Sequence, residues 1–190
     1  MRIPKAASGS VTRALKHKKA KIITHDIKNP NYLSMAEYMK VDVHKKFAFT
    51  FVRNPWDRLV SAFFYLNKGG VMPGDKDDYE KYLKKYGGDF TLFVHEAFKT
   101  DEIFNQLHIR PQFEWITDDN DKLVTDFVGK FETLQLDFDY ALKKNWRFKK
   151  KLSFQKRGKH PNYRELYTPD TRAIVAEAFG KDIELFKYEF

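Results

Sequence analysis

The chain has 190 residues, of which 42% are hydrophobic, and it carries a formal net charge of +9 at pH 7. This length and composition suit one folded domain and argue against extensive disorder. The lack of cysteine excludes disulfides, thiolate metal sites and a cysteine nucleophile. No stretch reaches the ~20 apolar residues of a membrane-spanning helix, and the N-terminus lacks the apolar core of a secretory signal, so we expect a cytoplasmic protein.

The first predicted feature is a short loop that leads into a helix. It consists of a lysine followed by five small residues, namely Lys5, Ala6, Ala7, Ser8, Gly9 and Ser10. Small side chains let backbone N–H groups approach a phosphate, and the start of a helix adds positive partial charge to that of the lysine. The order differs from that of a Walker loop, in which the lysine comes last. We interpret this segment as an anion-binding loop, the alternative being an ordinary strand-to-helix turn.

Three short stretches rich in apolar, β-branched or aromatic residues are predicted strands, at 20–24, 46–53 and 126–132. Helical patterns fill the intervals between them. Strands that alternate with helices favour an α/β fold with a parallel sheet and helices on both faces. We see no linker or repeat, so we place no domain boundary.

The strand 46–53 and the helix after it offer a second set of anion-binding groups. Asn54 is a good N-cap, and Pro55 suits the first helical position. Arg53 lies at the carboxyl end of the strand, where α/β sheets present ligand groups, and Ser61 lies two turns into the helix. Such an arginine and serine can hold one phosphate by a bidentate charged hydrogen bond and a hydroxyl bond.

Further helices are predicted over 90–99, 136–146 and 169–179, the last of them with Thr168 as its N-cap and Gly180 as its end.

Two loop segments have different interpretations. Glycine-containing stretches at 69–78 and 86–89 bracket a short helix that we expect to be polar and to cross over a cleft. The acidic stretch 117–121 lacks the glycine and the terminal glutamate of a calcium loop, so we expect a turn there.

Positive charge is concentrated near the C-terminal third of the chain. The segment from Lys143 to Arg164 holds ten basic residues and no acidic one, whereas the remainder has 25 basic and 26 acidic residues. Such a segment favours a surface that meets anions, the alternative being a solvated helix face followed by a basic loop.

The motifs IPKAASGS and FAFTFVRNPWDRLVSAFFYL together resemble the PAPS-dependent sulfotransferases, in the carbohydrate branch that includes bacterial members and the heparan and chondroitin enzymes. The similarity continues in RPQFEWI, in DFVGKFETLQLDF and in the C-terminal HPNYRELYTPDTRAIVAEAFGKDIELFKYEF. The resemblance implies a P-loop-like α/β fold, a parallel sheet flanked by helices, in one sulfotransferase domain over residues 1–190. It also implies transfer of a sulfuryl group from 3′-phosphoadenosine 5′-phosphosulfate (PAPS) to a hydroxyl, with a glycan as the expected acceptor.

The resemblance assigns the two anion motifs to two parts of PAPS. Lys5 and residues 6–10 fall in the loop that holds the 5′-phosphosulfate, and Arg53 and Ser61 fall in the 3′-phosphate motif. Relatives run a full apolar strand into the lysine, whereas only residues 1–3 precede Pro4 here. The first strand is therefore either very short or the chain begins late.

A third part of the resemblance is looser. The loop QKRGKH, which contains Arg157, and the nearby Tyr163 fall where the family closes over the cofactor. Many relatives carry an asparagine and a serine where this chain has Lys156 and Gly158.

Sulfuryl transfer needs a cation for the leaving phosphate and a base for the acceptor hydroxyl. Lys5 supplies the cation, and His25, directly after the strand 20–24, is the first candidate for the base. His108 and Glu132 are alternatives, and His160 suits a cofactor contact better. No metal is required, because no grouping of His, Asp and Glu has ligand spacing.

Two other functions compete with this one. A nucleotide kinase or phosphotransferase is disfavoured by the inverted lysine order and by the lack of an obvious magnesium-binding carboxylate beside a Walker loop. A nucleic-acid-binding module would use the basic segment 143–164. We expect a sulfotransferase that does not bind nucleic acid.

Overall fold

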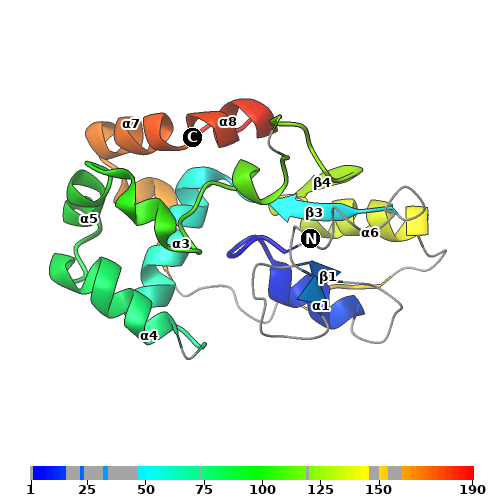
Figure 1. Ribbon diagram of the computed structural model, residues 1–190, viewed down its shortest axis with the longest axis horizontal. Coiled ribbons are helices and arrows are strands. Elements are labelled where there is room, and N and C mark those ends of the chain that lie inside the picture. Colours follow the sequence, from blue (N-terminus) through cyan, green and yellow to red (C-terminus); the bar gives the residue numbers. More distant parts are fainter. Residues whose placement is uncertain are drawn as a thin grey trace. The chain divides into compact units, whose positions relative to one another are not determined.

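The computed structural model describes residues 2–15, 22–23, 32–33, 47–72, 74–118, 120–145, 150–153 and 160–190. The chain divides into two compact units. The first is formed by Met1–Arg53 and Glu114–Lys156, and the second by Asn54–Phe113 and Arg157–Phe190. Figure 1 labels the elements of both units. Within the described ranges, no helix has the length and apolar character needed to cross a membrane.

The strands of the first unit pair in parallel. Strand β1 (Ile22–Ile23) pairs with β2 (Tyr32–Leu33), and β3 (Phe49–Val52) pairs with β4 (Phe127–Lys130). The predicted strands contain β1, β3 and β4, and their parallel direction is confirmed. Because parallel strands end at the same edge, the residues that follow β3 and β4 come together there.

Helices α1 (Ser8–Leu15) and α6 (Leu134–Asn145) belong to the same unit. All four residues of β3 are buried, as expected for a strand covered on both faces. The apolar core of this unit joins α1, β3, α6 and the segment after α6, through Ala14, Leu15, Phe49, Phe51, Leu134, Phe138, Ala141, Leu142 and Leu152. The α/β class with parallel strands flanked by helices is therefore confirmed.

The acidic stretch near residue 118 forms a turn, as predicted. Thr117 and Leu123 form an isolated antiparallel bridge across it. Within the turn, the Asp118 carboxylate accepts hydrogen bonds from the backbone N–H groups of Asn120 and Lys122, both at 2.9 Å. An aspartate that binds its own following backbone is a normal turn device.

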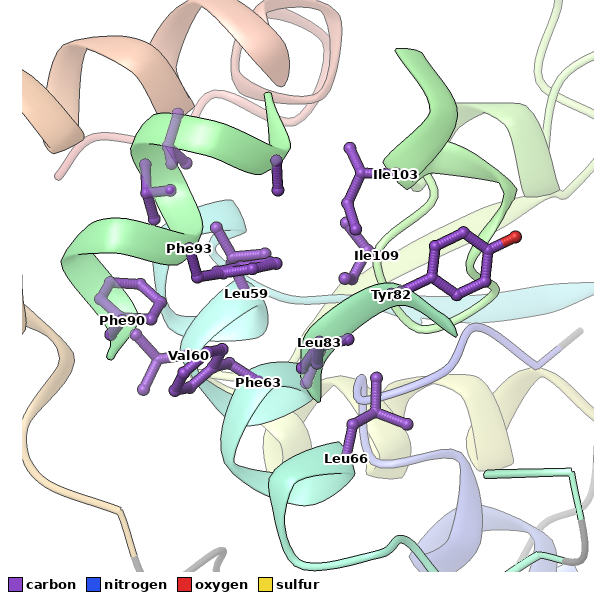
Figure 2. Close-up of a cluster of buried hydrophobic side chains, with 14 of the residues drawn as sticks. Leu59, Val60, Phe63, Leu66, Tyr82, Leu83, Phe90, Phe93, Ile103 and Ile109 are labelled. Carbon is purple, nitrogen blue, oxygen red and sulfur yellow. The ribbon is translucent and has the colours of Figure 1, made fainter. Parts of the chain in front are cut away.

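The second unit is built on α3 (Pro55–Asn67). Asn54 caps the helix as predicted, because its side-chain oxygen accepts from the backbone N–H groups of Trp56 and Asp57 at 3.1 and 3.5 Å. Phe63 of α3 lies in an aromatic cluster, with its ring centroid 5.2 Å from that of Phe90 and 5.0 Å from that of Phe93 (Figure 2).

The segment after α3 corrects a prediction. It runs as α4 (Asp75–Asp78), a π-helical turn (Tyr79–Leu83) and a 3₁₀ turn (Lys84–Tyr86), between glycine pairs with positive φ at 69–70 and 87–88. The predicted helical segment is present, but the expectation that it is polar is wrong. Tyr82, Leu83 and Tyr86 are buried in the core of the second unit, and Figure 2 shows Tyr82 and Leu83 among its hydrophobic side chains. The lysines of the same segment, Lys81, Lys84 and Lys85, are exposed.

The remaining helices of the second unit are α5 (Phe90–Ala97), α7 (Pro169–Ala178) and α8 (Gly180–Phe186). Short 3₁₀ turns cover Asp101–Asn105 and Tyr163–Leu166, and another, Phe113–Trp115, lies where the two units meet in the sequence. Thr168 caps α7 as predicted. Helix α7 ends just before Gly180, close to the predicted end, and the sequence did not predict the second helix that follows. Phe179 leaves helical geometry, its carbonyl accepts from the Ile183 N–H at 3.0 Å, and α8 begins directly at Gly180.

Candidate functional site

The loop before α1 has an unusual backbone. Lys5 and Ala7 adopt positive φ angles of 66° and 60°, a region that non-glycine residues rarely occupy. The Ala7 carbonyl accepts from the N–H groups of Ser10 and Val11 at 3.0 and 3.2 Å, so α1 begins directly after the loop. Strain of this kind costs of the order of 1 to 3 kcal/mol per residue and is concentrated at ligand sites.

The start of α1 has room beside it. A Cβ atom at Gly9 would meet no heavy atom of the described residues within 4 Å, so packing does not require a glycine at this position. The first N–H groups of a helix have no partner inside it and favour anions. Open space at Gly9 therefore suits the close approach of a ligand to the helix start.

Arg53 joins this loop to the edge of the sheet. Its side chain follows β3, is 7% exposed, and donates from Nη1 to the Lys5 carbonyl at 3.2 Å. The guanidinium carbon lies 4.2 Å from the centroid of the Phe131 ring, just after β4. The structure thus brings together Lys5 and Arg53, two residues that sequence reasoning selected independently.

Other predicted site residues of the first unit are less defined. Glu132 is exposed and lies two residues beyond β4, at the carboxyl edge of the strands. His25 lies outside the described residues, two positions after the end of β1. Arg157, which belongs to the second unit, also lies outside the described residues.

Ser61 lies in α3 of the second unit and is 7% exposed. Arg58, one turn earlier, points into the core, is 1% exposed, and donates from Nη1 to the Ile109 carbonyl at 3.5 Å. Burial raises the pKa of Asp182 above its ordinary value, and the positive charge of Arg58 partly opposes this rise. Arg58 therefore has a structural role within this motif.

Tyr163 is half-buried at the start of a 3₁₀ turn. Its ring meets that of Phe190 edge-on with centroids 5.6 Å apart, and the Arg164 guanidinium lies 4.6 Å from its centroid. Phe190 also lines a pocket of about 400 Å³ with Tyr167 and Arg172. The Tyr163 ring thus has one arginine over it and meets a phenylalanine that lines a pocket. Its role as a cofactor contact stays a prediction.

The histidines of the second unit differ in their ring hydrogen bonds. The Gln106 side-chain oxygen accepts from the His108 backbone N–H at 2.6 Å, so the Gln106 amide nitrogen faces Nδ1 of His108 at 3.1 Å. Neutral His108 therefore carries its proton on Nε2. In His160, Nδ1 donates to the Pro161 carbonyl at 2.9 Å, so Nε2 is the basic nitrogen.

His108 belongs to a polar cluster that the sequence did not predict. Ligand-type atoms of Asp75, Asp78 and His108 lie within 4.8 Å of one another. The side-chain NH₂ group of Gln106 donates to the Asp78 carboxylate at 2.9 Å and to Nδ1 of His108. This NH₂ group therefore lies between the two side chains. These contacts give the cluster a structural role, and the expectation that no metal is needed stays a prediction.

The cluster also holds the loop before α4. One carboxylate oxygen of Asp75 accepts from the Tyr65 hydroxyl and from the backbone N–H groups of Val71 and Met72, both at 2.7 Å. Burial and the bond to Asp75 raise the pKa of Tyr65 to about 12. Burial alone would raise the pKa of Asp75, but these hydrogen bonds outweigh it and lower that pKa. Burial raises the pKa of Asp78.

A strained loop at a helix start, beside an arginine at the carboxyl edge of parallel strands, is typical of α/β proteins that bind anions. Comparison with known proteins is more specific. The model of the Sulfotransferase family matches residues 1–189, and the chain belongs to this family, whose enzymes depend on PAPS. The general family prediction is thereby confirmed.

A relative provides no further assignment. An uncharacterized protein of Archaeoglobus fulgidus is 31% identical over 98 residues, which cover 50% of this chain and 64% of that protein. The match thus spans less than two thirds of the relative. No solved structure matches the chain significantly.

Sequence reasoning missed two features of the site. The positive φ angles of Lys5 and Ala7 have no signal in the residue types, because glycine is the usual residue there. The ring of Phe131 under Arg53 depends on the pairing of β3 with β4. The parallel strand prediction could have suggested this contact, since both residues follow strand ends.

Proposed function

We propose that the protein transfers the sulfuryl group of PAPS to a hydroxyl group of a carbohydrate. The observation that carries the proposal is the joining of Lys5 to Arg53 at the edge of the parallel strands, within a chain of the Sulfotransferase family. We treat residues 1–190 as one sulfotransferase domain, and the cytoplasmic location stays a prediction.

The residues at this edge fit a ligand with two anionic groups. The small residues 6–10 and the start of α1 would hold the 5′-phosphosulfate, with Lys5 as the adjacent cation. Arg53 would hold the 3′-phosphate, and the family resemblance adds Ser61 to that role and Arg157 and Tyr163 as further cofactor contacts. PAPS, when bound, supplies the activated sulfuryl group.

Lys5 stabilises the negative charge that develops on the leaving phosphate oxygen, because a fixed cation in a partly buried site is more effective than solvent. A base must take the proton of the acceptor hydroxyl. We propose His25 for this role, since β1 leads to it and the family resemblance favours it. Glu132 at the strand edge is the alternative. His108 is less suitable, because its Nδ1 faces the Gln106 amide.

The acceptor proposal draws on an exposed surface of α6. Tyr140 is 47% exposed, and Lys144 lies over its ring with the ammonium 5.5 Å from the centroid. Lys143, Lys150 and Lys151 are also exposed. An aromatic face next to several cations suits a sugar ring that carries acidic groups, as in an anionic glycan.

Calorimetry tests the function directly. The wild-type chain is titrated with adenosine 3′,5′-bisphosphate, with ATP and with a short DNA duplex at two salt concentrations. We expect binding of the bisphosphate in preference to ATP, and weak or undetectable DNA binding at physiological salt. Micromolar DNA binding that falls steeply with salt, without bisphosphate binding, would overturn the proposal in favour of a nucleic-acid-binding protein.

A further inference from the structure

We propose that Phe131 is a positioning residue for the anion loop: its ring holds the Arg53 guanidinium in the orientation from which Arg53 binds the Lys5 carbonyl. The inference deepens the proposed function and rests on it for its link to cofactor binding. Two contacts support the inference. The Arg53 guanidinium carbon lies 4.2 Å from the centroid of the Phe131 ring, and Arg53 donates a hydrogen bond to the Lys5 carbonyl at 3.2 Å.

The backbone of Phe131 is fixed without help from its ring. Its N–H donates to the Val52 carbonyl at 2.7 Å, which extends the pairing of β3 with β4 by one step, and its carbonyl accepts from the Leu134 N–H at 3.2 Å. The side chain is half-buried and lies outside the apolar core cluster of the first unit. The ring is therefore placed by the sheet, at the point where Arg53 leaves the neighbouring strand.

The environment makes this contact energetically important. Arg53 is only 7% exposed, and the attraction between a cation and an aromatic face strengthens as water is removed. The guanidinium carbon lies over the ring, 4.2 Å from its centroid, and a guanidinium donates its hydrogen bonds from the edge of its own plane. Phe131 thus restricts the direction in which Nη1 donates.

The orientation of Arg53 in turn affects the backbone conformation of Lys5. A lysine with φ of 66° keeps that conformation only where its surroundings hold it, and the bond from Arg53 to its carbonyl is one such restraint. Removing the ring frees Arg53 to change rotamer. The loop then samples other conformations, and the groups that would hold the cofactor are less well organised before binding.

Two substitutions of Phe131 distinguish the effect of its aromatic face from that of its size. Phe131→Leu keeps an apolar side chain but removes the aromatic face, whereas Phe131→Tyr keeps the face. Calorimetry with adenosine 3′,5′-bisphosphate should show about a five- to tenfold rise in Kd for Phe131→Leu and less than a twofold change for Phe131→Tyr. In an Arg53→Ala background, Phe131→Leu should have no further effect.

A matched control is available on the same strand. Phe127 begins β4 and packs on Tyr140 with ring centroids 4.8 Å apart. Phe127→Leu should lower the melting temperature but leave the Kd for the bisphosphate unchanged. A rise in Kd for Phe127→Leu equal to that for Phe131→Leu would show a general packing effect and overturn the inference.

Hydrogen exchange gives a readout that needs no ligand. Peptides that cover residues 2–15 should exchange faster in Phe131→Leu than in the wild type or Phe131→Tyr, while the core strands keep their protection. Unchanged exchange there, or an undiminished effect of Phe131→Leu without Arg53, would overturn the inference and leave the proposed function standing. A wild-type chain that fails to bind the bisphosphate overturns the proposed function instead, and exchange still decides the role of Phe131.

Discussion

Arg53 donates a hydrogen bond from Nη1 to the backbone carbonyl of Lys5 at 3.2 Å and so joins the end of β3 to the loop before α1. This one contact relates the two anion motifs of the chain. The same guanidinium that is proposed to bind the 3′-phosphate also holds the backbone of the residue proposed to assist the leaving phosphate. Binding of one end of the cofactor and organisation of the other therefore depend on a single side chain.

Arg53→Ala should weaken the binding of adenosine 3′,5′-bisphosphate by about 2 kcal/mol, or roughly thirtyfold in Kd, the scale for loss of a charged hydrogen-bond partner. Arg53→Lys should recover little, because an ammonium group lacks the planar fork. Calorimetry measures both. Arg13→Ala provides the control, since Arg13 is an exposed arginine at the end of α1. Unchanged affinity in Arg53→Ala would show that the proposed 3′-phosphate site is misplaced.

Lys5→Ala should lower kcat by about 10² or more and leave the melting temperature almost unchanged. Its proposed role is to stabilise charge in the transition state, and its side chain is only half-buried, so the core does not depend on it. Steady-state transfer rates and thermal unfolding give the two readouts. A Lys5→Ala protein that retains most of its kcat would exclude this role.

Part of this site could be predicted because its signals are local. Lys5 precedes a run of small residues, and Arg53 precedes an Asn-Pro pair that begins a helix, so a single short segment reveals each one. The parallel sheet followed from the alternation of strands and helices. These predictions depend on neighbours in sequence, where residue type strongly determines backbone conformation.

The remaining features depend on partners that are distant in sequence. Tyr82 and Leu83 lie among lysines and acidic residues, which make the segment look polar in the sequence. Packing against α3 nevertheless buries both side chains. Asp182 is an ordinary acidic residue of a C-terminal helix by sequence, yet its carboxylate receives the backbone N–H groups of Gln112 and Phe113 at 2.8 and 2.7 Å. No local pattern encodes such pairings.

Asp182→Asn should destabilise the second unit by about 3 kcal/mol. Each carboxylate oxygen of Asp182 accepts a backbone N–H, and the Gln112 side-chain amide donates to the same oxygen as the Gln112 backbone, at 3.3 Å. An asparagine would present an NH₂ group to buried donors on one side, and unsatisfied buried donors are costly. Denaturant unfolding measures the loss. Glu184→Gln on the same helix α8 is the control, and an equal loss there would contradict the assignment.

The pH dependence of this effect has a defined sign. Burial, opposed by Gln112 and Arg58, raises the pKa of Asp182 above its unfolded value of 3.8. A raised carboxyl pKa contributes stability below pH 3.8 that is lost as pH rises through the folded-state pKa. The stability difference between wild type and Asp182→Asn should therefore shrink as pH rises through the acidic range. A difference that grows with pH would show that the pKa is lowered instead.

Two glycines of the first unit should respond oppositely to alanine. A Cβ at Gly129 would lie 2.6 Å from a ring carbon of Phe51 and 2.9 Å from the Asp137 Cβ, whereas one at Gly9 meets nothing within 4 Å. Gly129→Ala should cost about 1 to 3 kcal/mol of stability through overpacking. Gly9→Ala should keep or raise stability, since alanine favours helices, but should weaken bisphosphate binding by blocking close approach. Thermal unfolding and calorimetry on both variants check this, and a stable Gly129→Ala protein would contradict the close packing of β4 on β3 and α6.

His25→Ala should lower kcat by about 10² with little change in the Kd for adenosine 3′,5′-bisphosphate, because a general base acts on the acceptor hydroxyl and not on cofactor binding. A base must be neutral to accept a proton, so the wild-type rate should fall as pH drops below the histidine pKa, ordinarily about 6.5. This acid limb should disappear in His25→Ala.

If the acid limb persists in His25→Ala, the pH profile of Glu132→Gln tests whether Glu132, at the strand edge, is the base. His108→Asn completes the set: because His108 Nδ1 faces the Gln106 amide, its profile should keep the acid limb, and loss of the limb there would instead identify His108 as the base.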